Sequence, residues 1–325
     1  MLKNVFVVIP NWNGAGFIAE CLDSLAEQTQ KHTTVVVDNG SIDDSVSIIE
    51  KKYPTITLLK QDKNHGFAGG VNIGIKHAIK NGADAVALFN NDAVADKNWL
   101  KKLVERMNQD KTIGIVTSKL MLDDKKHLDS TGDFYSVWGM PFPRGRNQRD
   151  EGQYDQAEDV FAASGGASLY RAELLKDIGY FDEDFFAYYE DVDISFRAQL
   201  ADWSVTYEPK AIAYHRLSGT SSKLGSFSRY HATKNFHYLY IKNMPGWLLW
   251  KYFPLYALQD LRLSLGSIKH RQLTTHLKAE AEALGKLPAI LKKRRLIQRG
   301  RKTSIKHIDS LLYKNRPPKI PNIDT

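Results

Sequence analysis

Short apolar runs alternate with helical patterns along the first third of the chain. The runs that we expect to form strands are residues 5–10, 34–38, 55–60, 85–90 and 113–119. Between them, apolar residues recur three and four positions apart, as on a helix that packs one face against a sheet. These helical segments are residues 17–28, 43–52 (with Ser41 as the N-cap), 70–81 and 99–110. Strands that alternate with helices predict βαβ units and a mixed, mostly parallel sheet flanked by helices, which is an α/β fold.

The second half of the chain changes character twice. Residues 123–160 are polar and irregular, and loops of that length often form a lid or a binding segment. A helix at 191–200 and a short strand at 204–207 follow. After Ser218 the sequence becomes aromatic, apolar and basic, with helical patterns. We therefore expect one α/β domain over residues 1–217 and a helical, basic extension over residues 218–325.

The charge of the chain is divided in the same way. Residues 216–325 carry 22 Lys and Arg against 5 Asp and Glu, a net charge of +17, whereas the residues before them carry 23 against 32, a net charge of −9. An acidic body with a basic tail suggests an anionic partner, either a membrane or a nucleic acid. The composition, 42% hydrophobic and 25% charged, is that of a globular protein and excludes a disordered one. The single cysteine, Cys21, excludes a disulfide framework and predicts a reducing compartment.

Two predicted strands end in carboxylates. Asp38 closes the strand TVVVD, and Asp92 follows the strand AVALFN after two asparagines. Ligands bind at the carboxyl ends of the strands in open α/β sheets. Asp92 could bind a divalent cation that bridges to a diphosphate, or it could simply cap a turn. Asp38 could accept a hydrogen bond from a nucleotide base, although the sequence DNGS is also a good turn.

Three later features could also carry chemistry. The glycine-rich stretch 65–70 precedes a helix, where backbone N–H groups can approach an anion, but a tight turn into the helix is the simpler explanation. Residues 181–193 mix carboxylates with aromatic side chains, which would desolvate the carboxyl groups and raise their pKa values. His215 could complete a cation site, although a lone histidine is more often structural.

The order and spacing of these segments resemble family 2 glycosyltransferases of the GT-A fold, and within them the rhamnosyltransferase-like branch. The matching stretches are VVIPNWNG (7–14), VVVDNGSIDDS (35–45), NHGFAGGVNIGI (64–75), ALFNNDA (87–93), GYFDEDFFAYYEDVDISFR (179–197) and YHRLSGTS (214–221). The resemblance covers about residues 3–245. It implies a metal-dependent, inverting hexosyltransferase that uses a nucleotide-diphospho-sugar.

The resemblance also assigns roles to residues, position by position. Asp191 matches the catalytic base and Glu190 the acid that precedes it. Asp92 matches the last acid of the DxD element that holds Mg²⁺ or Mn²⁺ on the diphosphate, and His215 matches a late histidine ligand. Here that element reads Asn90-Asn91-Asp92, so its first acid is missing. The residues expected to border the nucleotide sugar are Pro10, Asn11, Asn13, Asp38, Gly66, Phe67, Gly69, Gly70, Asn72 and Asn91.

The branch that the chain resembles indicates dTDP-L-rhamnose as the donor and a saccharide or lipid-linked acceptor in cell-surface polysaccharide synthesis. A UDP-hexose or UDP-galactofuranose remains an alternative donor, because an aspartate at position 38 reads uracil and thymine alike. Trp138 and Tyr135 could stack on a sugar ring or be buried, and residues 145–154 could form a lid.

The tail admits two readings. Residues 244–265 are apolar and aromatic, but Lys251, Asp260 and Arg262 interrupt them, so the segment does not span a membrane. It fits an interfacial helix or, equally, a helix packed on the catalytic domain or in a homodimer contact. A basic cluster at 292–302 would attract anionic lipid. No nucleic-acid-binding motif accompanies that cluster, so we expect no nucleic acid partner. Because residues 1–10 show no signal peptide, we expect a cytoplasmic protein, peripheral at the inner face of the membrane.

Two other classes of function compete with this hypothesis. A nucleotide-sugar-binding module without catalysis would lack the base or a metal ligand, whereas Asp191, Asp92 and His215 are all present. A nicotinamide-dependent dehydrogenase would carry a G-x-G-x-x-G fingerprint after its first strand, and residues 5–10 are not followed by one.

Overall fold

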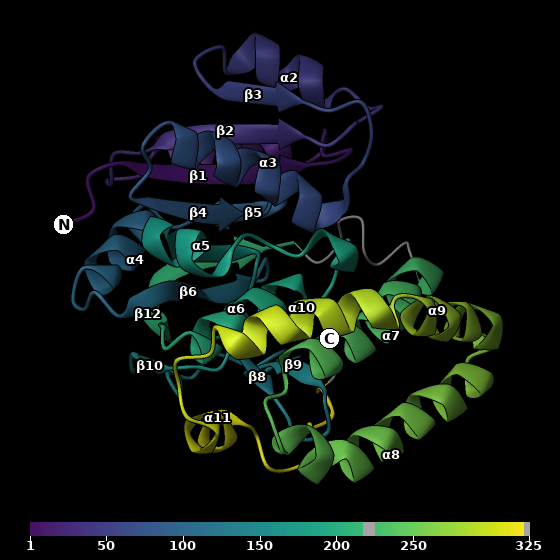
Figure 1. The fold of residues 1–325 in the computed structure, drawn as a ribbon. Coiled ribbons are helices and arrows are strands. Elements are labelled where there is room, and N and C mark those ends of the chain that lie inside the picture. Colours follow the sequence, from purple (N-terminus) through teal and green to yellow (C-terminus); the bar gives the residue numbers. More distant parts are fainter. Residues whose placement is uncertain (217–224, 322–325) are drawn as a thin grey trace.

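A mixed sheet runs through the N-terminal two thirds of the chain, and helices cover both of its faces (Figure 1). The structure is a computed structural model that describes residues 1–216 and 225–321. The strands of the main sheet are β1 (Val5–Asn11), β2 (Thr33–Asp38), β3 (Thr57–Lys60), β4 (Ala85–Phe89), β5 (Ala93–Ala95), β6 (Ile113–Leu122), β7 (Leu128–Ser130), β10 (Glu158–Asp159), β11 (Ala167–Arg171) and β12 (Ser204–His215). A separate hairpin pairs β8 (Asp133–Tyr135) with β9 (Pro141–Pro143).

The order of the strands creates a crevice beside β1. Neighbouring strands follow the order β10-β12-β6-β11-β4-β1-β2-β3. β1 pairs in parallel with both β2 and β4, while β11 runs antiparallel between β4 and β6. The chain order therefore reverses at β1, and ligands of open α/β sheets bind at such a point, outside the carboxyl ends of the strands. The predicted α/β fold, with its mostly parallel sheet, is confirmed.

Each face of the sheet has its own hydrophobic core, because side chains alternate along a strand. Val5, Val7 and Ile9 of β1 point into one core, together with α1 (Ile18–Ala26) and α4 (Trp99–Met107). Phe6 and Val8 point into the other, together with α3 (Gly66–Lys80) and α5 (Ala172–Ile178). Burial on both faces explains why β1 reads as a continuous apolar run.

Several element boundaries differ from the predictions. The helix expected at 70–81 begins four residues earlier, at Gly66, and the strand expected at 204–207 continues to His215. The short strand β5 was not predicted at all. Ser41 is not an N-cap: α2 (Ser45–Lys52) begins after Asp44, and the Ser41 hydroxyl accepts a hydrogen bond from the backbone N–H of Asn13.

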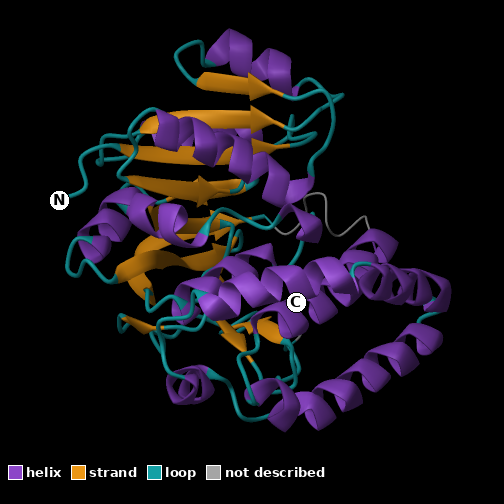
Figure 2. Cartoon of the chain, viewed as in Figure 1, coloured by secondary structure: helices purple, strands orange, loops and turns teal. Residues whose placement is uncertain are grey.

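Beyond β12, the elements of the described chain are helices (Figure 2). They are α7 (Gly225–Asn243), α8 (Leu248–Lys269), α9 (Leu273–Gly285), α10 (Leu287–Arg299) and α11 (Ile305–Leu311). α7 and α10 pack beside α6 (Glu190–Leu200), around a third core rich in aromatic side chains. The expected domain boundary between residues 217 and 218 lies outside the described residues. In the described parts of the chain, each helix falls short of the length and apolar character needed to cross a membrane.

One side of α8 faces away from the protein. Its exposed apolar side chains, with that of the preceding residue, are Trp247, Trp250, Phe253, Leu258, Leu261, Leu265 and Ile268. Tyr252 and Tyr256 on the other side belong to the third core. In contrast, part of the basic cluster predicted to attract lipid makes contacts within the protein. Lys293 pairs with Asp182 and Asp184. Arg294 donates to the backbone carbonyls of Ile241 in α7 and of Met244 just after it.

Candidate functional site

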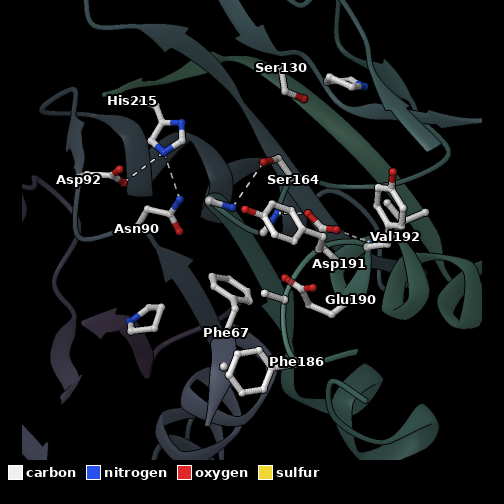
Figure 3. Close-up of a pocket in the computed structure, with 18 of the residues that line it drawn as sticks. Phe67, Asn90, Asp92, Ser130, Ser164, Phe186, Glu190, Asp191, Val192 and His215 are labelled. Atoms are coloured by element: carbon white, nitrogen blue, oxygen red, sulfur yellow. Dashed lines mark hydrogen bonds and ion pairs between the residues drawn. The ribbon is translucent and has the colours of Figure 1, made fainter. Parts of the chain in front are cut away.

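A cavity of about 470 Å³ opens at the carboxyl ends of β1 and β4. The loop that follows β4 and the glycine-rich start of α3 form one part of its wall. The segment before α6, the hairpin β8–β9 and the last residue of β12 form the rest. Figure 3 shows Asp92 and His215 on one side of this cavity and Glu190 and Asp191 on another. Of the residues predicted to act on substrate, those that line it are Pro10, Asn11, Gly66, Phe67, Asn91, Asp92, Glu190, Asp191 and His215.

Asp38 lies behind Asn11 rather than in the cavity wall. The buried Asn11 amide donates to Asp38 Oδ1 at 3.1 Å, and its oxygen accepts from Asn91 at 2.8 Å. Asp38 also accepts the backbone N–H of Ser41 at 3.2 Å. Asn13 likewise lies outside the lining and ties its loop to the turn after β2 by accepting the backbone N–H of Ile42. Asp38 thus holds in place the loop that borders the cavity.

The glycine-rich start of α3 packs tightly against the segment that precedes α6. Gly66 has φ +73°, and a Cβ there would lie 2.3 Å from the carbonyl oxygen of Phe186. Ala68 N–H donates to that same oxygen at 3.2 Å. Gly69, Gly70 and Asn72 lie farther along the helix, outside the cavity lining. The side chain of Asn72 exchanges hydrogen bonds with the backbone of Phe181, so it anchors the acidic segment to α3.

Asp92 and His215 meet although they are far apart in the sequence. β12 pairs with β5, with His215 opposite Ala93, and this register brings the imidazole beside the loop after β4. His215 Nε2 lies 3.1 Å from Asp92 Oδ1 and 3.3 Å from Asn90 Nδ2. Both side chains are largely buried and border the cavity. Adjacent ligands of an octahedral Mg²⁺ or Mn²⁺ site are about 3 Å apart when each bond is about 2.1 Å long. The donor pair therefore fits such a cation.

The other ring nitrogen of His215 contacts Asp129, a carboxylate that no sequence motif pointed to. Asp129 Oδ2 lies 2.7 Å from Nδ1, and Arg146 pairs with the second oxygen of Asp129 at 2.8 Å. Metal-binding histidines are commonly oriented by such a partner. Burial lowers the pKa of His215. The hydrogen bonds that its ring N–H groups donate to the Asp129 and Asp92 carboxylates outweigh burial and raise the pKa to about 10. Arg146 comes from residues 145–154, the segment predicted to be a lid, and it lines the cavity.

Asp191 stands at the start of α6, where the backbone is constrained. Phe186, Tyr188 and Tyr189 all have φ between 64° and 70°, a region that side chains other than glycine rarely adopt. Such outliers cluster at functional sites. Asp191 Oδ2 accepts the N–H of Gly165 at 2.9 Å, and a Cβ at Gly165 would lie 3.3 Å from the Cβ of Asp191. Burial raises the pKa of Asp191 above its ordinary value.

Glu190 and Asp133 are the two other acids beside Asp191. Glu190 is 6% exposed, and its Oε2 has no hydrogen-bond partner among the described residues. Burial first, and then the charge of Asp191, raise the pKa of Glu190 well above its ordinary value. Asp133, which sequence reasoning missed, lines the cavity and accepts a hydrogen bond from Ser130 at 2.8 Å. Burial and the charge of Asp191 raise the pKa of Asp133 to about 7.

The other carboxylates of the acidic, aromatic run serve the fold. Asp182 pairs with Lys242 and Lys293, each at 2.5 Å, and the fully buried Asp193 pairs with Lys242 and Arg197. These pairs join α6, α7 and α10. Only the two acids at the start of α6 turn toward the cavity.

Of the two aromatic residues expected either to stack on a sugar or to be buried, Tyr135 is buried. Its exposure is 0%, and its ring stacks on Phe161. The guanidinium of Arg262 lies over the ring of Trp138, with its Cζ 4.9 Å from the ring centroid. The aromatic side chains that do line the cavity are Trp12, Phe67, Phe142, Phe186, Tyr188, Tyr189 and Phe227.

The mixed, mostly parallel sheet flanked by helices, with further helices at the C-terminal end, matches the GT-A fold of solved glycosyltransferases. The sequence model of glycosyl transferase family 2 matches residues 6–179, more than half of the chain. The chain therefore belongs to this family, as the motifs predicted. The rhamnosyltransferase-like branch stays a prediction.

The chain is similar to a poly-beta-1,6-N-acetyl-D-glucosamine synthase of Staphylococcus aureus (strain MSSA476), with 24% identity over 263 residues. The match covers 79% of this chain and 60% of the synthase, so the chain spans less than two thirds of that relative. A synthase of the same name from Staphylococcus epidermidis is 24% identical over 219 residues, which cover 66% of this chain and 50% of that relative.

Among solved structures, TarS residues 1–349 of S. aureus in complex with UDP-GlcNAc superposes with a TM-score of 0.58 at 17% identity, covering 95% of this chain and 90% of that TarS chain. A mannosyltransferase of Pyrobaculum calidifontis in complex with GDP-Man and Mn²⁺ gives a TM-score of 0.53 at 17% identity, covering 94% and 85%. At these identities the likeness shows the fold.

Proposed function

We propose that the chain is a metal-dependent, inverting glycosyltransferase that moves a sugar from a nucleotide-diphospho-sugar to a saccharide or lipid-linked acceptor. The observation that carries the proposal is the arrangement of one cavity: a carboxylate–histidine pair on one side, and on another a carboxylate whose pKa is raised. The first pair suits the leaving diphosphate, and the second group suits the attacking hydroxyl. The poly-beta-1,6-N-acetyl-D-glucosamine synthase, the TarS complex with UDP-GlcNAc and the mannosyltransferase complex with GDP-Man support this class of reaction.

Asp92 and His215 would hold the divalent cation, Mg²⁺ or Mn²⁺. A cation bound there would neutralise the charge that develops on the leaving diphosphate. Asn91 keeps the loop in place through its hydrogen bond to Asn11, and Asp129 keeps His215 Nε2 directed at the cation position. Asn90 stands where the usual DxD element has its first acid, so this chain offers one carboxylate there. We therefore expect weak metal affinity when no nucleotide-sugar donor is bound.

The nucleotide would lie along the ends of β1 and β2. Pro10, Asn11, Gly66 and Phe67 line the cavity and would contact it. Asp38 would reach the base only if Asn11 yields its hydrogen bond, and otherwise positions the loop. Gly69 and Gly70 allow close packing, since a Cβ on Gly70 would lie 3.0 Å from the Asn39 amide. Asn13 and Asn72 would not contact the nucleotide. They would hold segments of the site in place through their hydrogen bonds to the backbone of Ile42 and Phe181.

Asp191 would remove the proton from the acceptor hydroxyl as that oxygen attacks the anomeric carbon. Attack on the face opposite to the leaving diphosphate inverts the anomeric configuration. Partial desolvation brings the pKa of the carboxylate closer to neutral pH, which makes it a stronger base. The backbone N–H groups of Gly165 and Val192 fix its orientation at 2.9 and 2.8 Å. Glu190, which is buried beside Asp191 and lines the same cavity, would shape the pocket rather than act as the base.

We propose dTDP-L-rhamnose as the donor, on the resemblance of the motifs, with a UDP-hexose or UDP-galactofuranose as the alternative. The test is incubation of the purified protein with Mn²⁺ or Mg²⁺, a panel of nucleotide sugars and a simple acceptor, with release of the nucleoside diphosphate as the readout. One donor should react much faster than the others and only with metal. Release from none of the donors by a folded protein would reject the proposed reaction.

We further propose that the exposed face of α8 contacts an anionic membrane. Its apolar side chains, from Trp247 to Ile268, lie within residues 216–325, which carry a net charge of +17. Interfacial helices combine such a face with basic residues. Sedimentation with vesicles containing anionic lipid should carry the wild-type protein down, and Trp250→Ser with Leu261→Ser should leave it in solution. If the protein instead forms dimers that this double variant disrupts, the face is a contact between two copies.

A further inference from the structure

Three helices outside the catalytic cavity bring together a second set of metal-binding side chains. His237 lies on α7, Asp260 on α8 and Glu280 on α9, and the donor atoms of all three lie within 4.8 Å of one another. His237 Nε2 is 2.9 Å from Glu280 Oε1 and 3.7 Å from Asp260 Oδ1. A fourth side chain, His276, places its Nε2 3.4 Å from the same Glu280 oxygen.

One oxygen of this group has no partner. Asp260 Oδ1 is inaccessible to solvent and accepts no hydrogen bond from the described residues. It faces the imidazole of the buried His237 from beyond hydrogen-bonding distance. Burial raises the pKa of Asp260, and the Glu280 carboxylate adds to this against the effect of His237. A buried carboxylate oxygen without a partner is costly, so the geometry calls for a positive group between the two acids.

The separations fit a small tetrahedral cation. With bonds of about 2.0–2.1 Å, two ligands of tetrahedral Zn²⁺ are roughly 3.3 Å apart. His237 Nε2 lies 2.9 Å from Glu280 and 3.7 Å from Asp260, on either side of that value, and the fourth side chain, His276, lies 3.4 Å from Glu280. One or two imidazole nitrogens with two carboxylates form a donor set that suits zinc.

The surroundings of the histidines also suit a metal site. Tyr256 hydrogen-bonds the Nδ1 of His237, which leaves Nε2 directed at the two acids. Thr233 Oγ1 lies 3.5 Å from the Nδ1 of His276, whereas Ser264 Oγ lies 2.8 Å from its Nε2, so a bond from His276 to a metal would displace Ser264. Such outer contacts fix the orientation of ligand imidazoles in metal sites.

We propose that His237, Asp260 and Glu280 bind Zn²⁺, with the fourth position taken by water or His276. The site would tie α7, α8 and α9 together. This matters for the catalytic cavity because α7 supports its wall two residues before His237: the Asn235 amide donates to the backbone carbonyls of Phe185, Ala187 and Tyr188 at 2.7–2.9 Å. The zinc would therefore stiffen the segment that leads into Asp191. This site is separate from the proposed catalytic cation.

The test measures zinc in the full-length protein by mass spectrometry and by titration. All proteins carry Asp92→Asn, so that the catalytic site adds no zinc. We expect one zinc per chain, and a rise in melting temperature of roughly 5 °C at a zinc concentration about 100-fold above its dissociation constant. Co²⁺ should give the visible absorption bands of four-coordinate cobalt. Asp260→Asn and Glu280→Gln should each lower zinc affinity at least tenfold, which at the same zinc concentration reduces the thermal shift to about half or less.

The matched control is Glu282→Gln, two residues from Glu280 on the same helix. Glu282 is held by Tyr230 and Lys234 rather than by the histidines, so this variant should keep the zinc. His237→Gln gives a second ligand change if one of the carboxylate variants fails to fold. The proposal is overturned if no zinc binds in the Asp92→Asn background, if zinc stays bound in both ligand variants, or if Glu282→Gln loses as much zinc as they do.

Discussion

Replacing Asp191 by asparagine tests the proposed base with little change in shape. The wild-type carboxylate accepts one hydrogen bond from Gly165 N–H and another from Val192 N–H. An asparagine keeps one acceptor and turns an amide NH₂ toward the other donor, so one of these bonds is lost. A bond of that kind contributes about 1.5–3 kcal/mol. The removal of a partly desolvated charge offsets part of this loss, and we expect a modest fall in melting temperature.

The effect on turnover should be much larger. A positioned general base contributes about 10²–10⁴-fold, which corresponds to roughly 2.7–5.5 kcal/mol of transition-state stabilisation. Binding of the donor should stay close to wild type, because Asp191 does not belong to the proposed cation pair. In the wild-type protein the rate should rise with pH as Asp191 loses its proton and then level off. Since burial raises this pKa, the rise should lie above the ordinary range of an aspartate.

The assay compares rates of sugar transfer with donor affinities from calorimetry for three variants. Glu190→Gln should lose far less activity than Asp191→Asn, because glutamine keeps the size and polarity of a buried side chain that is not the proposed base. Asp202→Asn is the surface control at the other end of α6, where the residue is exposed and asparagine suits its φ of 68°. Turnover by Asp191→Asn within threefold of wild type would reject Asp191 as the base. A large loss in Glu190→Gln with a small one in Asp191→Asn would move the role to Glu190.

Three further predictions concern the frame of the site. Gly66→Ala should lower the free energy of unfolding by at least about 2 kcal/mol in a denaturant titration, since the position has φ +73° and its new Cβ would meet the Phe186 carbonyl. Asp182→Asn should cost about 2 kcal/mol, because Lys242 and Lys293 each lose one of their two carboxylate partners. Burial would raise the pKa of Asp182, but the lysines hold it well below its ordinary value. The stability it provides is therefore complete above about pH 4 and disappears as the pH falls, so acid unfolding of the variant should be less steep. For Asp133, whose pKa is raised to about 7, the sign is opposite: stability should fall as pH rises from about 4 to 7 because only the folded chain holds the proton, and Asp133→Asn should flatten that dependence in metal-free thermal melts.

The sequence predicted the strands and helices of the N-terminal half well, because their periodicity is local. Val5 to Ile9 alternate between two cores, and Ile18, Cys21, Leu22 and Leu25 bury one face of α1, as their spacing indicates. The exceptions depend on contacts between distant segments. β5 is three residues long and exists by pairing with β12, more than a hundred residues later.

The start of α3 was misplaced for a physical reason. Gly66, Gly69 and Gly70 have poor helix propensity, so the pattern suggested a loop before the helix. In the structure these glycines are required by close packing, against Phe186 at the first position and Asn39 at the third. Tertiary contact outweighs local preference there.

The acidic, aromatic run shows why the site could be predicted only in part. Local sequence cannot separate Asp191 from Asp182, because both stand among carboxylates and aromatic residues. What separates them are the partners of Asp182, Lys242 and Lys293, which lie 60 and 111 residues away. Asp129 and Asp133 were missed for the related reason that they lie in an irregular segment and reach the cavity only through the fold.

The central claim is that a cation between Asp92 and His215 holds a nucleoside diphosphate in the cavity that Asp191 borders. The most direct test is diffraction at the manganese absorption edge from crystals grown with Mn²⁺ and dTDP or UDP. The account predicts an anomalous peak within bonding distance of Asp92 Oδ1 and His215 Nε2 and in contact with the diphosphate. A nucleotide bound elsewhere, or manganese found only beside His237 while the diphosphate lies in the cavity without it, would contradict the account.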